Sequence, residues 1–252
     1  MSSVNHKDPA VTHDTLFDGE LVCLQHKEGY RFSVDSVILA HFIHPDKGDI
    51  ILDLGTGCGI ISLIMGYRWK AILDSITGVE KQSSLVTLAK RNIAMNGFDE
   101  FCHVIKGDVK TLFQTVDRQS FSKVICNPPF YQSGTGRINK NREALLARHQ
   151  ISVTLDDFIS AAAAAVKNRG ATYFIYPAQN LGDLLLLSKK HKLEPKKIMF
   201  VYSYPQPAKS AELVLVKCLK NGGSGVEVMA PFYVYKEKNG SYSPEMASYY
   251  AR

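Results

Sequence analysis

The chain has 252 residues, 45% of them hydrophobic, which is enough to bury the core of one large α/β domain with extensions. Lys and Arg exceed Asp and Glu by 30 − 24 = 6, a modest basic excess that suits a polyanionic partner. Five cysteines without a Cys-x-x-Cys pair, and histidines at no metal-ligand spacing, argue against a disulfide framework and a zinc site. With no apolar run of roughly 20 residues, we expect a cytoplasmic protein without a membrane span. The oligomeric state is open at this point, with a monomer favoured.

The first 45 residues form a separate segment ahead of the main apolar runs. Residues 21–24 and 30–32 suggest a hairpin around residues 27–29, and residues 35–41 suggest a helix. We expect residues 1–45 to be an N-terminal extension that packs as a lid over the mouth of a larger domain, residues 46–252.

Short apolar runs alternate with helical patterns through the middle of the chain. This alternation predicts an α/β fold in which a parallel sheet carries crossover helices on both faces. The predicted strands are 49–53, 75–80, 101–106, 121–126 and 171–176, and the predicted helices are 60–69, 83–96, 155–167 and 181–191.

The last third of the chain breaks this alternation. The strand-like runs 197–204 and 211–219 are joined only by a short proline-containing loop, with no helix between them. Two consecutive strands joined in this way are antiparallel neighbours or lie far apart. Residues 231–235 predict one further short edge strand.

A glycine-rich turn, Asp53-Leu-Gly55-Thr56-Gly57-Cys-Gly59, follows the first buried strand and precedes a helix. Glycines at such a turn let the backbone bend sharply and approach a ligand closely, and the helix start offers free N–H groups. The spacing is Gly-x-Gly-x-Gly rather than the Gly-x-Gly-x-x-Gly of dinucleotide-binding proteins, which argues against NAD.

Acidic residues end the next two strands of the predicted sheet. Glu80 can accept both hydroxyls of a ribose, and Asp108 can accept from an adenine amino group. Because strand ends open onto one edge of a parallel sheet, these acids converge with Asp53. Clustered acids suit a ligand with a positive sulfonium centre and no phosphate, which favours S-adenosylmethionine over NAD.

The segment Asn127-Pro128-Pro129-Phe130 ends the fourth strand. The prolines fix the backbone and remove two donors, so carbonyls and the Asn127 oxygen remain as acceptors for an exocyclic NH₂. Such bonds strengthen as positive charge grows on the nitrogen, and Phe130 offers a face for a flat substrate. Cys126 precedes this segment and is interpreted as a buried strand residue rather than a nucleophile.

Basic residues gather in two places. The first group follows the proline segment, and we expect it to contact phosphates; the second flanks the exit of the last predicted helix and fits a solvated face. The first group is Arg137, Lys140, Arg142 and Arg148, and the second is Lys189, Lys190, Lys192, Lys196 and Lys197.

Together these motifs resemble class I methyltransferases that modify amino groups, over about residues 16–220. The chain is most similar to the bacterial tRNA adenine-N6 methyltransferase family, which modifies adenine-37 of a valine tRNA; residues 32–40 resemble its N-terminal motif. The resemblance implies a Rossmann-like, seven-stranded, mostly parallel sheet with an antiparallel last strand, S-adenosylmethionine as cofactor and tRNA as partner. It also implies that Asp35 lies near the methionine end of the cofactor. Lys81, beside Glu80, and Asn127 are counted with the cofactor-binding residues as well.

Three other functions remain open at this point. Similar proline segments occur in guanine-N2 rRNA methyltransferases and in glutamine-N5 methyltransferases of release factors, although the latter usually carry Tyr at the position of Phe130. A cofactor-binding RNA-binding factor without catalysis is a further alternative, against which the intact Asn127 to Phe130 segment argues.

Overall fold

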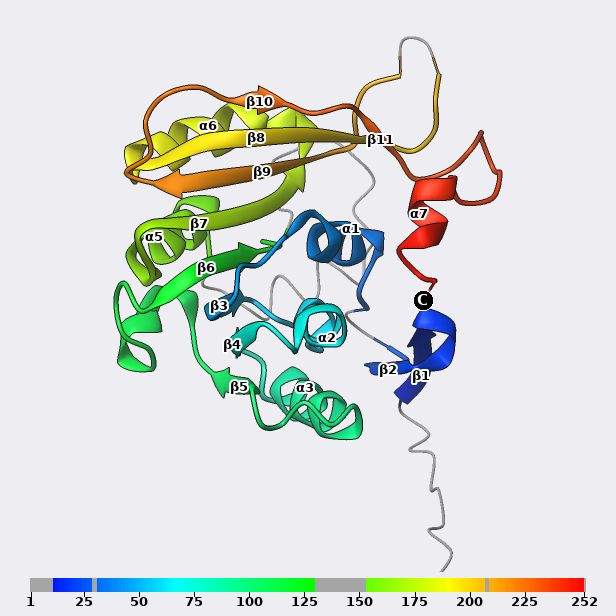
Figure 1. Ribbon diagram of the computed structural model, residues 1–252, viewed down its shortest axis with the longest axis horizontal. Helices are drawn as coiled ribbons and strands as arrows, with labels where there is room; N and C mark the ends of the chain where they lie inside the picture. Colours follow the sequence, from blue (N-terminus) through cyan, green and yellow to red (C-terminus); the bar gives the residue numbers. More distant parts are fainter. Residues whose placement is uncertain (1–10, 29–30, 130–152, 207–208, 252) are drawn as a thin grey trace, which may run out of the picture.

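The computed structural model describes residues 11–28, 31–129, 153–206 and 209–251. Helices cover both faces of one central sheet, with α5 and α6 on one face and α1, α2 and α3 on the other (Figure 1). This is the three-layer arrangement expected from alternating strands and helices. The α-helices are α1 (Val34–Phe42), α2 (Ile60–Trp69), α3 (Ser83–Met95), α5 (Leu155–Ala165), α6 (Leu181–Lys190) and α7 (Pro244–Ser248).

The central sheet has the strand order β10-β8-β9-β7-β6-β3-β4-β5, with β11 also paired to β8. The chain starts in the middle of the sheet at β3, runs outward to β5, and then returns to build the other half from β6. The strands are β3 (Asp49–Leu54), β4 (Leu73–Glu80), β5 (Cys102–Lys106), β6 (Phe121–Cys126), β7 (Val166–Pro177), β8 (Leu193–Tyr202), β9 (Leu213–Lys220), β10 (Glu227–Val228) and β11 (Phe232–Tyr233).

The predicted antiparallel strand is confirmed. β9 lies between β7 and β8 and runs antiparallel to both, whereas β3 to β7 pair with one another in parallel. The seven main strands are supplemented by β10 and β11, and β11 confirms the short edge strand predicted at residues 231–235.

The helix predicted at residues 155–167 is shorter than expected. A capping box of Thr154 and Asp157 begins α5 at the predicted position, but the helix ends at Ala165 and β7 begins at the next residue. Val166 pairs with Phe121 of β6, so pairing with the sheet replaces the last helical turn.

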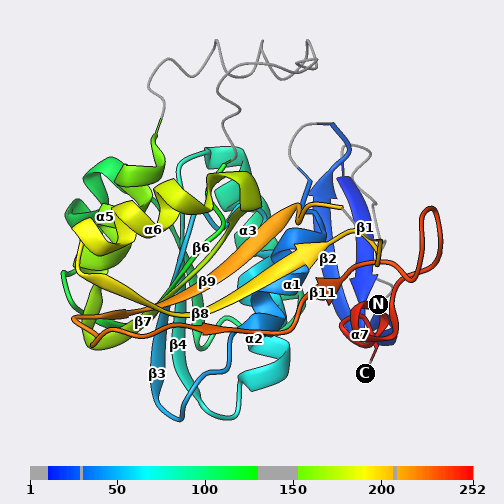
Figure 2. The ribbon, with the colours of Figure 1, turned by 90° about the horizontal axis from the view of Figure 1, so that it is seen from above.

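The N-terminal hairpin differs from the prediction. β2 (Leu21–His26) pairs with β1 (Val11–Leu16) across the short helix η1 (Phe17–Gly19), not with residues 30–32. The hairpin packs beside α2 and α3, and the C-terminal helix α7 lies next to it (Figure 2). A hydrogen bond from the Phe17 N–H to the Tyr250 carbonyl oxygen, 2.8 Å long, joins the two ends of the chain.

Candidate active site

The glycine turn links β3 to α2 at the carboxyl edge of the sheet. Gly55, Gly57 and Gly59 have φ values of 75°, 61° and 87°, in the left-handed region that side chains with a Cβ rarely adopt. Gly59 is also the N-cap of α2. Glycine at every second position of the turn is therefore a direct requirement of this backbone path.

Asp53 lies at the foot of this turn and is almost fully buried. Its Oδ2 accepts hydrogen bonds from Thr56 Oγ1 at 2.6 Å and Ser62 Oγ at 3.1 Å, while Oδ1 finds no partner among the described residues. Burial, and to a smaller degree the nearby Glu80 charge, raise the pKa of Asp53 to about 6 against the opposing effect of the two hydroxyls. A buried acceptor without a partner is unusual and fits a donor supplied by a bound ligand.

Glu80 ends the neighbouring strand β4 and is buried beside the turn. Its Oε2 accepts a hydrogen bond from the Gly57 N–H at 3.1 Å, and its Oε1 accepts one from the Gln82 N–H at 2.8 Å. Burial raises the pKa of Glu80 although these backbone donors lower it. The carboxylate therefore lies against the glycine turn, as the position of its strand end predicts.

Asp108 follows β5, whose pairing of Lys106 with Glu80 places it at the same edge of the sheet. Its Oδ2 forms an ion pair with Lys81 Nζ at 2.8 Å, and its Oδ1 accepts from the Lys110 N–H at 3.0 Å. Burial works to raise the pKa of Asp108, but the hydrogen bond from Lys81 and the other positive groups outweigh it and lower the pKa. Lys81 therefore contacts Asp108.

The proline segment begins directly after β6. Leu54 pairs with Cys126, so the glycine turn and the proline segment leave adjacent strands at the same level. Pro128 is buried and Pro129 is exposed, whereas Phe130 lies outside the described residues. Cys126 is fully buried in the strand, which confirms its interpretation as a core residue.

The Asn127 side chain, half-buried, reaches across to helix α1. Its Nδ2 donates a hydrogen bond to Ser36 Oγ at 3.2 Å. Ser36 was not singled out from the sequence, although it stands inside the motif of residues 32–40. Its neighbour Asp35 is half-buried in the first turn of α1, where burial raises its pKa against a hydrogen bond from Ser33.

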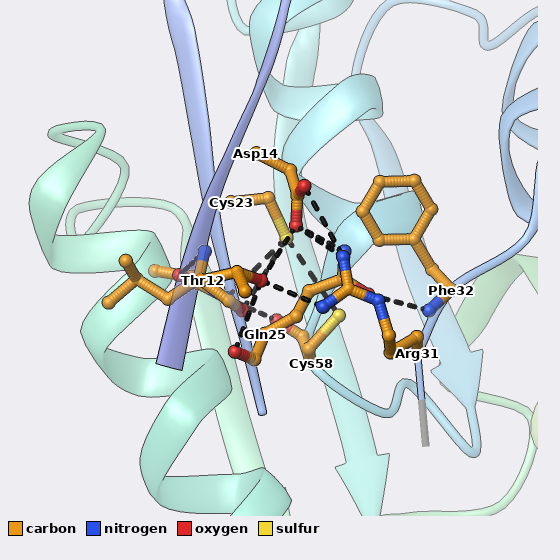
Figure 3. Close-up of polar contacts among 9 residues, drawn as sticks. Thr12, Asp14, Cys23, Gln25, Arg31, Phe32 and Cys58 are labelled. Atoms are coloured by element: carbon orange, nitrogen blue, oxygen red, sulfur yellow. Dashed lines mark hydrogen bonds and ion pairs between the residues drawn. The ribbon is translucent and has the colours of Figure 1, made fainter. Parts of the chain in front are cut away.

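The N-terminal hairpin contacts the glycine turn from the side, which sequence reasoning did not anticipate. The Cys23 and Cys58 sulfur atoms lie 3.8 Å apart, both as free, buried thiols (Figure 3). Asn92 of α3 joins the two segments, because its Nδ2 donates to the Cys58 carbonyl oxygen at 2.8 Å and its Oδ1 accepts from the Leu24 N–H at 2.8 Å. A buried asparagine in the middle of a helix, flanked by apolar positions, was the available signal.

The two predicted basic groups differ in what the structure describes. Arg137, Lys140, Arg142 and Arg148 all lie outside the described residues. Several lysines of the second group are held locally: Lys190 pairs with Asp156 at 3.0 Å, and Lys196 donates to three loop carbonyl oxygens at 2.8 to 3.3 Å. Lys189 and Lys197 likewise pair with Glu194 and Glu227.

Within residues 11–28, 31–129, 153–206 and 209–251, no group of three or more His, Cys, Asp or Glu side chains is placed to hold a metal ion. No helix in this part of the chain is long and apolar enough to cross a membrane.

Four parallel strand ends thus bring together a glycine turn, three carboxylates and an Asn-Pro-Pro segment. Its oxygens can accept hydrogen bonds from hydroxyl and amino groups, and its carboxylates attract a positive centre. One of these acceptors is Asp53 Oδ1, which has no partner among the described residues. These groups fit S-adenosylmethionine, whose donors are ribose hydroxyls, an adenine amine and a methionine ammonium. The fold and the site define a Rossmann-like methyltransferase that uses S-adenosylmethionine.

The chain belongs to the methyltransferase small domain family, which matches residues 31–179 and so more than half of its length. It is 26% identical over 219 residues to the tRNA1(Val) (adenine(37)-N6)-methyltransferase of Shewanella putrefaciens, covering 86% of this chain and 89% of that protein. The protein of the same name from Photobacterium profundum is 25% identical over 175 residues, covering 69% of this chain and 72% of the relative.

Solved structures confirm the fold. The predicted O-methyltransferase Atu636 from Agrobacterium tumefaciens superposes with a TM-score of 0.66 at 20% identity, over 86% of this chain and 99% of the other. TYW2 from P. horikoshii, solved in complex with MeSAdo, has a TM-score of 0.59 at 14% identity, over 87% of this chain and 75% of that structure.

Proposed function

We propose that this methyltransferase methylates the exocyclic N6 amino group of an adenine in tRNA, with adenine-37 of a valine tRNA as the acceptor. Support comes from the relatives of that name, which align over most of their length. In this proposal the enzyme acts in the cytoplasm, where it meets tRNA, and we favour a monomer. In this proposal residues 1–45 form an extension and lid for the catalytic domain, residues 46–252.

Residues at the strand ends bind the cofactor. The backbone of Gly55, Gly57 and Gly59 would allow the cofactor to approach closely. Thr56 holds Asp53 in place through the hydrogen bond from its Oγ1 to Asp53 Oδ2. Glu80 would accept from the ribose hydroxyls, and Asp108, whose Oδ2 pairs with Lys81, would accept from the adenine amine. Asp35 would lie at the methionine end. The cofactor supplies a methyl group bonded to a positively charged sulfur.

The proline segment binds the substrate amine. Asn127 Oδ1 and the Pro128 carbonyl oxygen accept from the two N–H groups of the amine, which turns the nitrogen lone pair out of conjugation with the ring. These hydrogen bonds strengthen as charge develops on nitrogen, so they stabilise the transition state more than the ground state. The nitrogen becomes acidic after transfer and loses its proton to water, without a dedicated base.

The substrate base has to leave its stack to reach these oxygens. Phe130 and Pro129 provide the surface on which it stacks. Arg137, Lys140, Arg142 and Arg148 contact the tRNA phosphates beside the segment.

One observation carries the proposal: Asn127 donates its Nδ2 to Ser36, which leaves Oδ1 available to an amine at the end of β6. The test is transfer of labelled methyl from S-adenosylmethionine to unmodified tRNA, followed by nucleoside mass spectrometry. Formation of N6-methyladenosine at position 37 of valine tRNA is expected. Label in N2-methylguanosine of rRNA, or in a glutamine of a release factor, would show that the substrate is that molecule instead. No transfer to any of them would indicate a cofactor-binding factor without catalysis.

A further inference from the structure

Helix α1 contributes a side chain to the candidate active site from outside the central sheet. Ser36 is 2% exposed, and its Oγ accepts the hydrogen bond from Asn127 Nδ2 at 3.2 Å. The two residues are 91 positions apart in the chain. The contact therefore joins the N-terminal extension to the segment proposed to bind the substrate amine.

The orientation of the Asn127 amide matters for that role. An asparagine amide has a donor end and an acceptor end, and rotation by 180° about χ2 exchanges them. That torsion has no sharp intrinsic preference. With Nδ2 toward the substrate, two NH₂ groups would face each other. The Ser36 hydroxyl could accept from Nδ2 or donate to Oδ1, and in the structure it accepts from Nδ2, so Oδ1 remains as the acceptor for the amine.

We propose that Ser36 is a positioning residue that holds the Asn127 amide with Oδ1 toward the substrate amine. The inference rests on the proposed function, because it assumes that Asn127 accepts from that amine. Ser36 itself touches no reacting atom; it acts by anchoring the Asn127 side chain, which raises the fraction of molecules in which that side chain lies where Oδ1 can meet the amine.

The start of α1 is held firmly enough for this purpose. The Phe32 N–H donates to Gln25 Oε1 at 2.7 Å, and Gln25 Nε2 donates to Asp14 Oδ2 at 2.6 Å (Figure 3). Arg31 also pairs with Asp14, at 3.1 Å. Two side chains of the hairpin, Gln25 and Asp14, thus anchor the residues just before α1. Such outer support is what keeps site residues in a productive geometry.

The α1 helix is also held at its other end. Arg68 of α2 donates from Nη1 to the Ala40 carbonyl oxygen at 3.2 Å. With both ends of α1 fixed, the Ser36 hydroxyl presents a stationary acceptor to Asn127.

The first experiment measures single-turnover methyl transfer to unmodified tRNA with full-length Ser36→Ala. We expect the rate constant to fall about tenfold, the cost of a lost orienting hydrogen bond. Affinity for S-adenosylmethionine and for tRNA should stay within twofold of wild type.

Ser36→Cys keeps a side chain of similar size, but its sulfur is a weak hydrogen-bond acceptor, so the rate should fall as in Ser36→Ala. This second variant tests the inference if Ser36→Ala folds poorly. The control is Ser188→Ala, a buried helical serine in α6, which should keep the wild-type rate.

A double-mutant cycle separates positioning from a structural role. If Ser36 acts through Asn127, Ser36→Ala should cause no further loss of rate in an Asn127→Ala background. An equal loss in both backgrounds, or a wild-type rate in Ser36→Ala and Ser36→Cys, would overturn the inference. The proposed function fails separately, if wild type transfers no methyl to tRNA or if Asn127→Ala is fully active.

Discussion

The Glu80 carboxylate accepts a hydrogen bond from the Gly57 backbone N–H at 3.1 Å, joining the end of β4 to the middle of the glycine turn. Its other oxygen accepts from the Gln82 N–H. The same carboxylate therefore shapes the turn and faces the place where we expect the ribose hydroxyls. Substitution of Glu80 should consequently affect cofactor binding more than any other property.

We predict that Glu80→Ala weakens the affinity for S-adenosylmethionine by at least tenfold, measured by titration calorimetry. Each hydrogen bond from a hydroxyl to a charged acceptor contributes about 1.5–3 kcal/mol. Glu80→Gln, which keeps one oxygen and the shape, should lose less. Glu100→Ala, at an exposed position before β5, is the control and should bind as wild type. Unchanged affinity in Glu80→Ala would remove this residue from the site.

Asn127→Ala should reduce turnover by about 100-fold or more while cofactor affinity stays near that of wild type. Loss of one preorganised group that contacts developing charge has effects of this size in other enzymes. Steady-state transfer to tRNA and calorimetry measure the two properties. Asn168→Ala, an exposed asparagine in β7, is the matched control. A variant that retains full activity would contradict the role given to Asn127.

Asp53 predicts a pH dependence of stability. Its pKa is raised from an ordinary value of 3.8 to about 6 by burial, with Glu80 adding to the effect. The folded protein therefore binds more protons between these values, so the associated stability is present below pH 4 and is lost as the pH rises through about 6. The loss amounts to about 3 kcal/mol, at about 1.4 kcal/mol per pKa unit.

Asp53→Asn does not ionise and should not show this loss. Urea unfolding of both proteins from pH 4 to pH 8 measures the difference in their free energies of unfolding. The difference cancels groups that titrate in both, such as His41, whose pKa burial lowers to about 4. A difference that is constant across this pH range would contradict the raised pKa of Asp53.

Binding of tRNA should weaken steeply with salt, because released counterions dominate such affinities. Arg142→Ala should lower the magnitude of the slope of log affinity against log salt by about one phosphate contact. Lys196→Ala should leave the slope unchanged, because that ammonium is already bound by the carbonyl oxygens of residues 223–225. Filter binding at several salt concentrations checks both; equal slopes for all three proteins would exclude Arg142 from the interface.

Local signals predicted the sheet well and the N-terminal hairpin poorly. β3, β6 and residues 171–176 of β7 are almost continuously buried, and β4 and β5 combine buried apolar positions with exposed polar ones, so each strand can be predicted from its own residues. Buried and exposed residues alternate only weakly along β1. Its polar residues Thr12 and Asp14 form hydrogen bonds and an ion pair with Gln25 and Arg31. A strand stabilised by long-range polar pairing has no apolar period from which to predict it.

The sequence by itself determined the glycine turn, the acids at the strand ends and the Asn-Pro-Pro segment. Each depends on the backbone geometry of consecutive residues, such as the positive φ of Gly55, Gly57 and Gly59. Only the tertiary structure decided that Ser36 meets Asn127, because that contact depends on how α1 packs against α2 and β7. Packing between distant elements is set by the shapes of many side chains together, and no short pattern around either residue encodes it.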